Sequence, residues 1–297
     1  RYYSEEKLLA LRSQAAYHVQ DAYINNSYMD YTSGQVTRSN ENLKAMLMSG
    51  HSVSFTYNAN ESFCNSETEA YYCPYYSLGN HIVLLVGWDD NYPKENFNED
   101  FQPENDGAWL IKNSWGDYGP ENGYAWISYE DQSANDYVVA IAEENDNYET
   151  QQSHDTFGWL TSLAPGDTPA KSSYLSTVLT AEADTEVCAA SFYTTDNGTE
   201  YEITVYTDLQ DPKNPTSGTA SDVTSGSEIY CGYHTVDLAR AVPVSAGEQY
   251  SIVVKLTNPE NPYPVAAEAL ITYQDIDGST SEMTPILEGA FETNTDY

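Results

Sequence analysis

The amino-acid sequence predicts a mainly β protein of the α+β class, with two domains and few helices. The chain has 297 residues, which suggests two domains rather than one. Its first half combines one clear helical pattern with strand patterns, whereas its second half alternates with a period of two throughout. A charged run, EENDNYET at 143–150, separates the halves. We therefore expect a first domain over 1–145 and a second over 146–297.

The amino-terminal region is expected to form a helix, a strand, a second helix and a second strand. Ser4 can cap a short helix over 4–11, and a strand begins at Tyr17. SNENLKAMLMSG, residues 39–50, predicts a helix with apolar residues spaced i, i+3 and i+4 and a glycine at its end. SVSFTY, residues 52–57, alternates apolar and polar residues as a half-buried strand does.

Three further strands complete the first domain. HIVLLVGW, residues 81–88, is apolar on both faces and predicts a central strand. Residues 108–111 and 124–129 predict a hairpin around a glycine-rich turn. A polar loop over 58–80 precedes the central strand, and an acidic insertion over 89–106 follows it.

The second domain is expected to be a β-sandwich or jelly roll. Its apolar residues recur at every second position, and turn-rich segments such as DNGT and SAGEQ separate the runs, without any helical period. The alternating residues that we expect to face the core are Leu175, Thr177, Leu179, Ala190, Phe192, Tyr201, Ile203, Val205, Val236, Leu238, Tyr250, Ile252, Val254 and Leu256.

The charge of the chain excludes two classes of partner. The sequence has 46 acidic and 11 basic residues, a formal net charge of −35. Such a surface repels phosphate backbones and anionic lipids, so we expect neither nucleic acid nor a membrane surface as a partner. No apolar run approaches the roughly 20 residues of a membrane span.

The acidic, lysine-poor and tyrosine-rich composition is typical of secreted bacterial proteins, and we expect an extracellular or cell-surface location. The amino terminus has neither an initiator Met nor the apolar region of a signal peptide. It resembles the interior of a longer precursor.

The four cysteines are expected to form two disulfides. Cys64 and Cys73 lie close together in the first domain, and Cys188 and Cys231 lie in the second. An even number of cysteines in an exported protein favours disulfides over thiols. In the chain-entropy model, these bridges would contribute about 3 and about 4 kcal/mol.

His81 and Asn113 are the candidate catalytic residues. His81 begins the central strand, and Asn113 ends the strand that we expect to pair with it. Neighbouring strands lie about 4.8 Å apart, so the two side chains can share a hydrogen bond. The amide oxygen would fix the tautomer of the imidazole and leave its other nitrogen to accept a proton. Trp115 can cover this hydrogen bond, which completes the orienting half of a nucleophile, base and orienter triad.

NHIVLLVGWDDNY and GAWLIKNSWGDYGPENGYAWISY resemble the His and Asn motifs of the papain-like (C1) cysteine peptidases. The resemblance covers roughly residues 15–130. It implies that His81 is the general base, that Asn113 orients it, and that Trp115 shields the pair. It also implies a papain-type antiparallel β-barrel lobe acting on peptide or protein substrates.

The nucleophile of that family is not found in this sequence. In the family, the nucleophilic Cys opens a long helix in a second, helical lobe, with a Gln a few residues earlier. Cys64 and Cys73 lie instead in a polar loop, where we expect a disulfide. The chain is thus expected to contain the barrel lobe without the helical, Cys-bearing lobe, and to be inactive alone.

Three origins of this arrangement stay open: a cleaved enzyme whose helical lobe is a separate or lost piece, a truncated product, or a gene that never encoded the lobe. The third would make the chain a catalytically inactive module that binds peptide or polysaccharide in an extracellular assembly. Active-site residues alone do not distinguish these possibilities.

The second domain resembles the lectin-like β domain that follows such peptidase domains in secreted bacterial proteins. AASFYTTDNGTEYEITVY and AGEQYSIVVKL are among the segments that carry the resemblance. It implies attachment or substrate presentation. Tyr206 and Tyr233 can stack on a sugar, although packing at the surface is the favoured interpretation of both, and His234 is expected to be a strand residue rather than a ligand.

No cofactor is expected. DDNYPKENFNED and SHDTFGW are rich in oxygen ligands and are possible calcium loops, but the spacing of the first does not match a known loop motif. A solvated acidic loop is the favoured interpretation. The sequence has no zinc-ligand or phosphate-loop spacing.

Overall fold

The computed structural model describes residues 7, 14–25, 28–30, 35–37, 39–117, 119–144, 147–152, 158–164, 169–267, 271–274 and 280–283. The chain forms two compact units. One is Ala22–Ala140, and the other combines Arg1–Asp21 with Ile141–Tyr297. Apart from Lys7, the short helix predicted over 4–11 lies outside the described residues.

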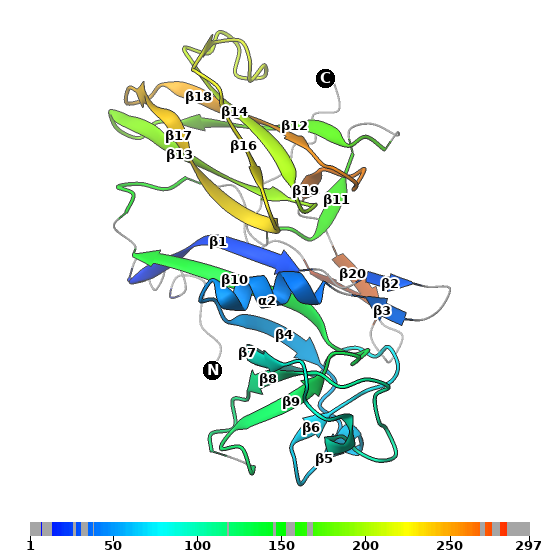
Figure 1. The fold of residues 1–297 in the computed structure, drawn as a ribbon. Helices are drawn as coiled ribbons and strands as arrows, with labels where there is room; N and C mark the ends of the chain where they lie inside the picture. The colour runs from blue at the N-terminus through cyan, green and yellow to red at the C-terminus, as the bar shows by residue number, and fades with distance from the viewer. Residues whose placement is uncertain are drawn as a thin grey trace. The chain divides into compact units, whose positions relative to one another are not determined.

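The first unit is built mainly from an antiparallel sheet in the order β10-β4-β7-β8-β9-β6-β5, in which only the β6–β9 pair is parallel (Figure 1). Its elements, including two strands that cross the unit boundary, are β1 (Tyr17–Asn25), β2 (Tyr28–Asp30), β3 (Gln35–Thr37), α2 (Asn40–Met48), β4 (Val53–Tyr57), η1 (Glu61–Phe63), β5 (Cys64–Asn65), β6 (Ala70–Tyr71), β7 (His81–Asp89), η2 (Lys94–Asn96), β8 (Ala108–Lys112), β9 (Tyr124–Ser128) and β10 (Asn135–Glu144).

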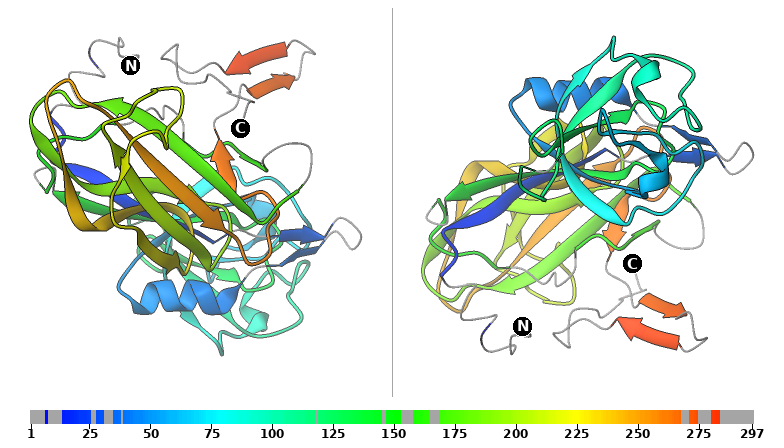
Figure 2. Two further views of the ribbon diagram at one scale, coloured as in Figure 1. Left: turned by 90° about the horizontal axis from the view of Figure 1, so that it is seen from above. Right: turned by 90° about the horizontal axis from the view of Figure 1, so that it is seen from below.

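Helix α2 forms where the sequence predicts it. The Ser39 side chain caps its first turn by accepting a hydrogen bond from the Asn42 N–H at 3.2 Å. Leu43 and Met46, on one face of the helix, are buried, and the helix packs on β4 and β7 (Figures 1 and 2). Lys44 bonds from the helix to the Asp90 carboxylate at 2.7 Å. Burial of one apolar face and this ion pair therefore fix the helix against the sheet.

The core of the first unit lies against β4. The residues of β4 alternate between buried and half-buried, as the period of two in the sequence predicts. Phe55 stacks on Tyr137 of β10, with 5.1 Å between the ring centroids, and Trp109 of β8 is fully buried. Residues 58–80 are not simply the polar loop predicted from the sequence, because they contain η1, β5 and β6. Strands of two residues are too short to produce a visible alternation.

The second unit is a two-layer β-sandwich. One layer has the order β12-β18-β14-β15, with β16 also paired to β14, and the other contains the long antiparallel pair of β13 and β17. The elements are β11 (Thr161–Leu163), β12 (Ser172–Thr180), β13 (Thr185–Thr194), β14 (Thr199–Thr207), β15 (Thr219–Ala220), β16 (Thr224–Glu228), β17 (Cys231–Val244), β18 (Gln249–Thr257), β19 (Val265–Ala267), β20 (Ile271–Gln274) and β21 (Thr280–Met283).

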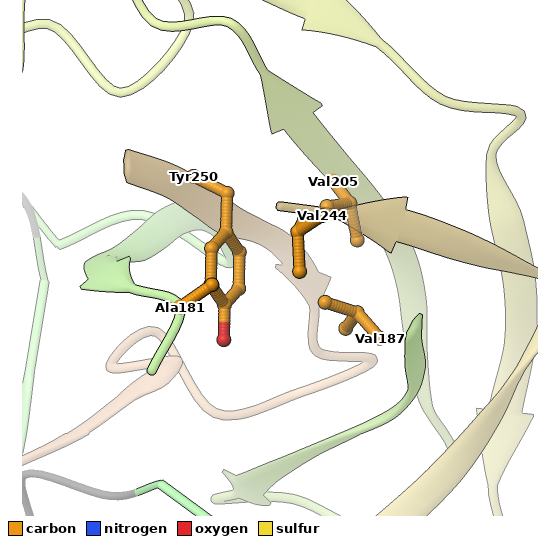
Figure 3. Close-up of a cluster of buried hydrophobic side chains, with 5 residues drawn as sticks. All are labelled: Ala181, Val187, Val205, Val244 and Tyr250. Atoms are coloured by element: carbon orange, nitrogen blue, oxygen red, sulfur yellow. The ribbon is translucent and has the colours of Figure 1, made fainter. Parts of the chain in front are cut away.

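Side chains from both layers meet in the core of this sandwich. Figure 3 shows one cluster, in which Val205 of β14 and Tyr250 of β18 face Val187 of β13 and Val244 of β17. A second cluster contains Ala190 and Phe192 of β13, Ile203 of β14, and Val254 and Leu256 of β18. Apart from Thr177, the alternating residues predicted to face the core belong to these two clusters or pack against them, and the prediction of a mainly β protein with a sandwich is confirmed.

Candidate active site

The register of β7 and β8 brings the candidate catalytic residues together. Leu84 pairs with Lys112, the last residue of β8. If this antiparallel ladder continued, Trp115 would lie opposite His81, and Asn113 would lie diagonally from it. The sequence thus places an imidazole, an amide and an indole at one end of two adjacent strands.

His81 and Asn113 share a hydrogen bond. The distance from His81 Nε2 to Asn113 Oδ1 is 2.9 Å, and the backbone N–H of Ser114 donates to the same oxygen at 2.8 Å. Because an amide oxygen only accepts, both partners must donate, and Nε2 carries the proton. In neutral His81, Nδ1 is then the nitrogen that can accept a proton.

Aromatic rings contact the imidazole from two directions. The Trp115 ring stacks on His81, with 4.9 Å between the centroids and 29° between the planes. The Tyr57 ring packs edge-on, at 5.8 Å and 62°. Trp115 remains 51% exposed and Tyr57 is fully buried, so one ring forms the outer wall of the site and the other its base. Their contacts restrict the orientation of the imidazole.

Tyr57 was not among the residues singled out from the sequence. The alternation of apolar and polar residues in SVSFTY predicted that Tyr57 is buried. Its closeness to His81, however, depends on the pairing of β4 with β7, in which Tyr57 lies directly opposite His81. A sequence signal for it did exist, because both residues stand at strand ends of the same expected sheet.

A glycine turn holds the backbone of Asn113. The Asn113 N–H donates to the Gly123 carbonyl at 2.9 Å. Gly123 has a φ of +87°, and a Cβ there would collide with the carbonyl oxygen of Gly116. Only glycine fits this conformation without displacing the turn that carries Trp115.

The predicted disulfide between Cys64 and Cys73 is wrong, since neither residue forms a disulfide in the structure. Cys64 of β5 lies opposite Tyr71 of β6, so Cys73 is two positions beyond its cross-strand neighbour. Diagonal residues of this kind lie about 7–8 Å apart, beyond the usual separation of bridged cysteines. The Cys73 thiol donates instead to the Tyr75 carbonyl at 3.2 Å.

The predicted disulfide between Cys188 and Cys231 is also wrong. Thr194 of β13 pairs with Gly232 of β17, and Cys188 lies at the bulge near the other end of β13. The two cysteines are thus separated by about 20 Å along this strand pair, at roughly 3.3 Å per residue. The even number of cysteines gave no information about this register.

The carboxylates of the acidic insertion take part in local hydrogen bonds. Asp90 accepts from Lys44 and from the Tyr129 hydroxyl, at 2.7 and 2.8 Å, and Asp106 accepts from the Lys94 N–H at 3.0 Å. No cluster of three or more potential metal ligands occurs among the described residues. The second possible calcium segment, 153–159, lies largely outside them. The expectation of a solvated acidic loop without a cofactor stays a prediction.

The tyrosines and the histidine considered for the second domain have different surroundings. Tyr233 of β17 packs against Tyr193, with 5.0 Å between the ring centroids. Tyr206 belongs to β14, in the other layer, so the two tyrosines do not share a surface. His234 is buried, as expected of a strand residue, with Nε2 at 3.0 Å from Thr194 Oγ1 and Nδ1 at 3.3 Å from Glu228 Oε2.

Comparisons with known proteins agree with this arrangement. Residues 2–145 match the papain family of cysteine proteases, and residues 148–282 match the lectin-like domain. The chain is a papain-family C1 peptidase domain followed by a lectin-like domain. The resemblance seen in the sequence is confirmed, and so is the fold class.

Two solved structures of the same protein resemble the chain over both of its domains. One is the clostridial cysteine protease Cwp84 after propeptide cleavage, with 27% identity, a TM-score of 0.68, and coverage of 88% of this chain and 61% of that one. The other contains the cysteine protease and lectin-like domains of Cwp84, a surface-layer-associated protein of Clostridium difficile. It gives 24% identity, a TM-score of 0.62, and coverage of 89% and 54%.

The chain therefore spans between half and two thirds of the length of these structures. A search of curated proteins found no match. No helix in the described part of the chain has the length and apolar character that a membrane-spanning segment requires.

Proposed function

We propose that the chain provides the general base His81 and the orienting Asn113 of a secreted bacterial papain-like cysteine peptidase, which hydrolyses peptide bonds in peptides or proteins. The observation that carries the proposal is the hydrogen bond from His81 Nε2 to Asn113 Oδ1, at 2.9 Å, beneath the stacked ring of Trp115. It leaves Nδ1 available for proton transfer in a fixed orientation.

In the proposed reaction, His81 Nδ1 takes the proton of a cysteine thiol, and the thiolate attacks the carbonyl carbon of the scissile bond. The imidazolium then gives this proton to the leaving amine nitrogen as the C–N bond breaks. Water hydrolyses the resulting thioester, with His81 accepting a proton from the water and returning it to the sulfur. Asn113 holds the imidazole in position throughout.

We further propose that the nucleophilic thiol belongs to a helical lobe outside these 297 residues. The environment of Cys64 supports this, because burial raises the pKa of its thiol to about 11, the reverse of what a nucleophile needs. Burial also raises the pKa of Cys73, whose thiol bonds to the Tyr75 carbonyl. The other cysteines belong to the lectin-like domain.

The surface beside His81 suits a covering lobe or substrate. The segment that leads into β7 carries Tyr75, Tyr76 and Leu78, with 54%, 42% and 78% of their surfaces exposed. Large apolar side chains exposed in this way mark sites of interaction when they occur together. We assign this segment to the face that meets the Cys-bearing lobe.

The similarity to a surface-layer-associated clostridial protein supports an extracellular or cell-surface location. The net charge of −35 is compatible with that location and unfavourable for binding nucleic acid. Neither the base nor the orienting residue requires a metal or an organic cofactor for this chemistry.

The test is activity and labelling of the native gene product that contains this chain. An epoxide reagent that alkylates active-site thiols should label it, and hydrolysis of an unfolded protein substrate should fall by about 10²–10⁴-fold in His81→Ala. His51→Ala is the matched control, because His51 lies in the same domain and contacts Tyr23 rather than the site.

Two results would overturn the proposal. One is a native product that neither reacts with the epoxide nor cleaves protein, which would indicate the inactive binding module instead. The other is full activity in His81→Ala, since a different base would then operate.

A further inference from the structure

A buried carboxylate holds the segment that leads into His81. Residues 73–80, which we call the 73–80 segment, form most of the connection between β6 and β7 (Figure 1). Asp131, in the turn between β9 and β10, is 1% exposed, and its Oδ2 accepts a hydrogen bond from the Cys73 N–H at 2.8 Å. The next residue, Gln132, donates its backbone N–H to the Cys73 carbonyl at 2.9 Å. One turn therefore fixes both backbone polar groups of Cys73.

The other oxygen of the Asp131 carboxylate holds its own turn. Oδ1 accepts from the Ser133 N–H at 2.8 Å, from the Ser133 hydroxyl at 2.7 Å and from the Ala134 N–H at 3.0 Å. Four donors thus converge on one side chain, and a carboxylate satisfies them because both of its oxygens accept. Breaking such a buried, matched set of hydrogen bonds is costly, so Asp131 is a rigid anchor.

Further hydrogen bonds extend this network along the same segment. The Ser133 hydroxyl accepts from the Asn58 N–H at 3.0 Å, just after β4, and the Asn58 side-chain amide donates to the Ser77 hydroxyl at 2.8 Å. Asn80, the last residue of the segment, donates its backbone N–H to the Tyr57 carbonyl at 3.0 Å. The segment is thus held at its start, its middle and its end.

The 73–80 segment presents large side chains to the solvent. Tyr75, Tyr76 and Leu78 are all exposed. The Tyr75 ring packs edge-on against Phe63, with 5.6 Å between the ring centroids. Because exposed side chains contribute little burial, the polar contacts are what fix the position of this segment.

The bond to Cys73 distinguishes Asp131 from an ordinary turn residue. An Asp that accepts from backbone N–H groups two or three positions later closes a local turn, and Oδ1 alone does this. Oδ2 instead bonds to a residue 58 positions earlier in the chain. A turn does not need that bond. Its effect is to join the connection after β9 to the connection before β7.

We propose that Asp131 is a positioning residue of the peptidase, which acts through Cys73 to hold the 73–80 segment where it meets the Cys-bearing lobe. This inference rests on the proposed function, in which a thiol of that lobe approaches His81. The imidazole has its own supports in Asn113 and Trp115. Asp131 sets a different quantity, the location of the surface against which the lobe docks. A displacement of about 1 Å can cost about 10²-fold in activity.

The substitution Asp131→Asn separates the two roles of the carboxylate. An amide has one accepting oxygen and one donating nitrogen. The new side chain is expected to keep its oxygen toward the three donors from Ser133 and Ala134, because the reverse orientation would lose all three bonds. Its NH₂ group then points at the Cys73 N–H, and two donors oppose each other. The turn is retained, and the link to the 73–80 segment is lost.

The first measurement is amide hydrogen exchange of the full chain, followed by NMR. Asp131→Asn should accelerate the exchange of the Gln132 and Asn80 N–H groups by about tenfold or more. The substitution leaves the acceptors of these two groups, the carbonyls of Cys73 and Tyr57, unchanged. Faster exchange therefore reports a looser segment, while amides of α2 and β8 should keep their rates.

Two further variants accompany this measurement. Ser77→Ala removes the bond from Asn58 with a smaller change in structure, and it should accelerate exchange of the same amides by a smaller factor. Asp106→Asn is the matched control, because the Asp106 carboxylate also accepts a backbone N–H, that of Lys94, but in the acidic insertion. It should leave exchange in the 73–80 segment unchanged.

The second measurement uses the native gene product that contains this chain. Asp131→Asn should lower both kcat and the rate of labelling by the epoxide reagent by about tenfold or more, because the thiol and the base are no longer aligned. The ¹⁵N shifts of His81 should stay unchanged, since Asn113 and Trp115 still hold the imidazole. A role in stability alone would lower the melting temperature without changing the labelling rate well below it.

Three results would overturn the inference: labelling and kcat equal to those of Asp106→Asn, unchanged exchange of the Gln132 and Asn80 amides, or altered ¹⁵N shifts of His81, which would mean that Asp131 acts on the base itself. If Asp131→Asn does not fold, Ser77→Ala decides, and unchanged exchange and activity in that variant are then the contrary result.

Failure of the proposed function looks different. In that case the unmodified native product does not react with the epoxide. The exchange measurements need no activity, so they still decide whether Asp131 holds the 73–80 segment.

Discussion

Asn113 Oδ1 accepts hydrogen bonds from two neighbours, His81 Nε2 at 2.9 Å and the Ser114 N–H at 2.8 Å. The second bond prevents the amide group from turning over, because the reversed group would point a donor at a donor. The backbone after β8 therefore sets the orientation of the His81 imidazole, through the Asn113 amide group. It does not depend on a bound substrate.

Replacing Asn113 with Ala should allow the His81 imidazole to adopt both of its neutral tautomers. Without the amide oxygen, the proton is expected to distribute between Nε2 and Nδ1, which ¹⁵N chemical shifts of the imidazole measure directly. In the native peptidase, activity should fall by about 10²-fold, as expected from a misplaced catalytic group. An unchanged ¹⁵N spectrum in Asn113→Ala would contradict this role. Ser114→Ala, which retains the backbone N–H, serves as the control.

Tyr57 is expected to position His81 through its ring rather than its hydroxyl. The edge of the ring packs against the imidazole, with 5.8 Å between the centroids. Tyr57→Phe should retain the ¹⁵N signature of His81, whereas Tyr57→Leu should broaden or shift it and lower kcat with little change in KM. If Tyr57→Phe and Tyr57→Leu have the same effect, the ring contact has no positioning role.

Gly123→Ala should destabilise the turn that carries Trp115. The substitution combines a strained positive φ with a collision against the Gly116 carbonyl, and we expect a loss of more than about 2 kcal/mol in the free energy of unfolding. Gly50→Ala is a matched control, because Gly50 has a φ of +91° but no atom within 4 Å of an added Cβ. It should cost only about 1 kcal/mol. Urea unfolding measures both, and equal losses would contradict the predicted collision.

The stability of the lectin-like domain should fall as the pH falls from 6.5 towards 4. Burial lowers the pKa of His234 to about 4 from an ordinary value of 6.5, so the unfolded chain takes up the proton first. Stability from this residue is fully present above pH 6.5 and is lost as the pH falls through 4. The loss amounts to about 3 kcal/mol at 1.36 kcal/mol per pH unit.

Two nearby carboxyl groups act in the opposite direction. Burial raises the pKa of Glu228, and it also raises that of Asp21, so both favour the folded state as they take up protons. The variant His234→Leu separates the effects, because it retains both carboxyl groups. Urea unfolding at pH 7 and pH 4.5 should show a smaller acid loss in this variant. An equal loss in both proteins would show that His234 is not its cause.

The sequence predicted features that depend on local pattern and missed those that depend on register. The strands, the helix and the closeness of His81 to Asn113 follow from the alternation of apolar residues and from two motifs at neighbouring strand ends. Tyr57 was missed because its contact arises from the pairing of β4 with β7. Both disulfides were predicted wrongly because the number of cysteines contains no information about register, such as where Cys188 and Cys231 lie along the β13–β17 strand pair.

The half-exposed Trp115 gives the protein an optical reporter of its own active site. Its indole lies 4.9 Å from the imidazole, close enough for the emission of the excited indole to be quenched when the imidazole gains a proton. The difference in fluorescence between the unmodified protein and a Trp115→Phe variant therefore isolates this signal from the other four tryptophans of the chain. Proton transfer at the base can be followed in real time, without a substrate or an added dye.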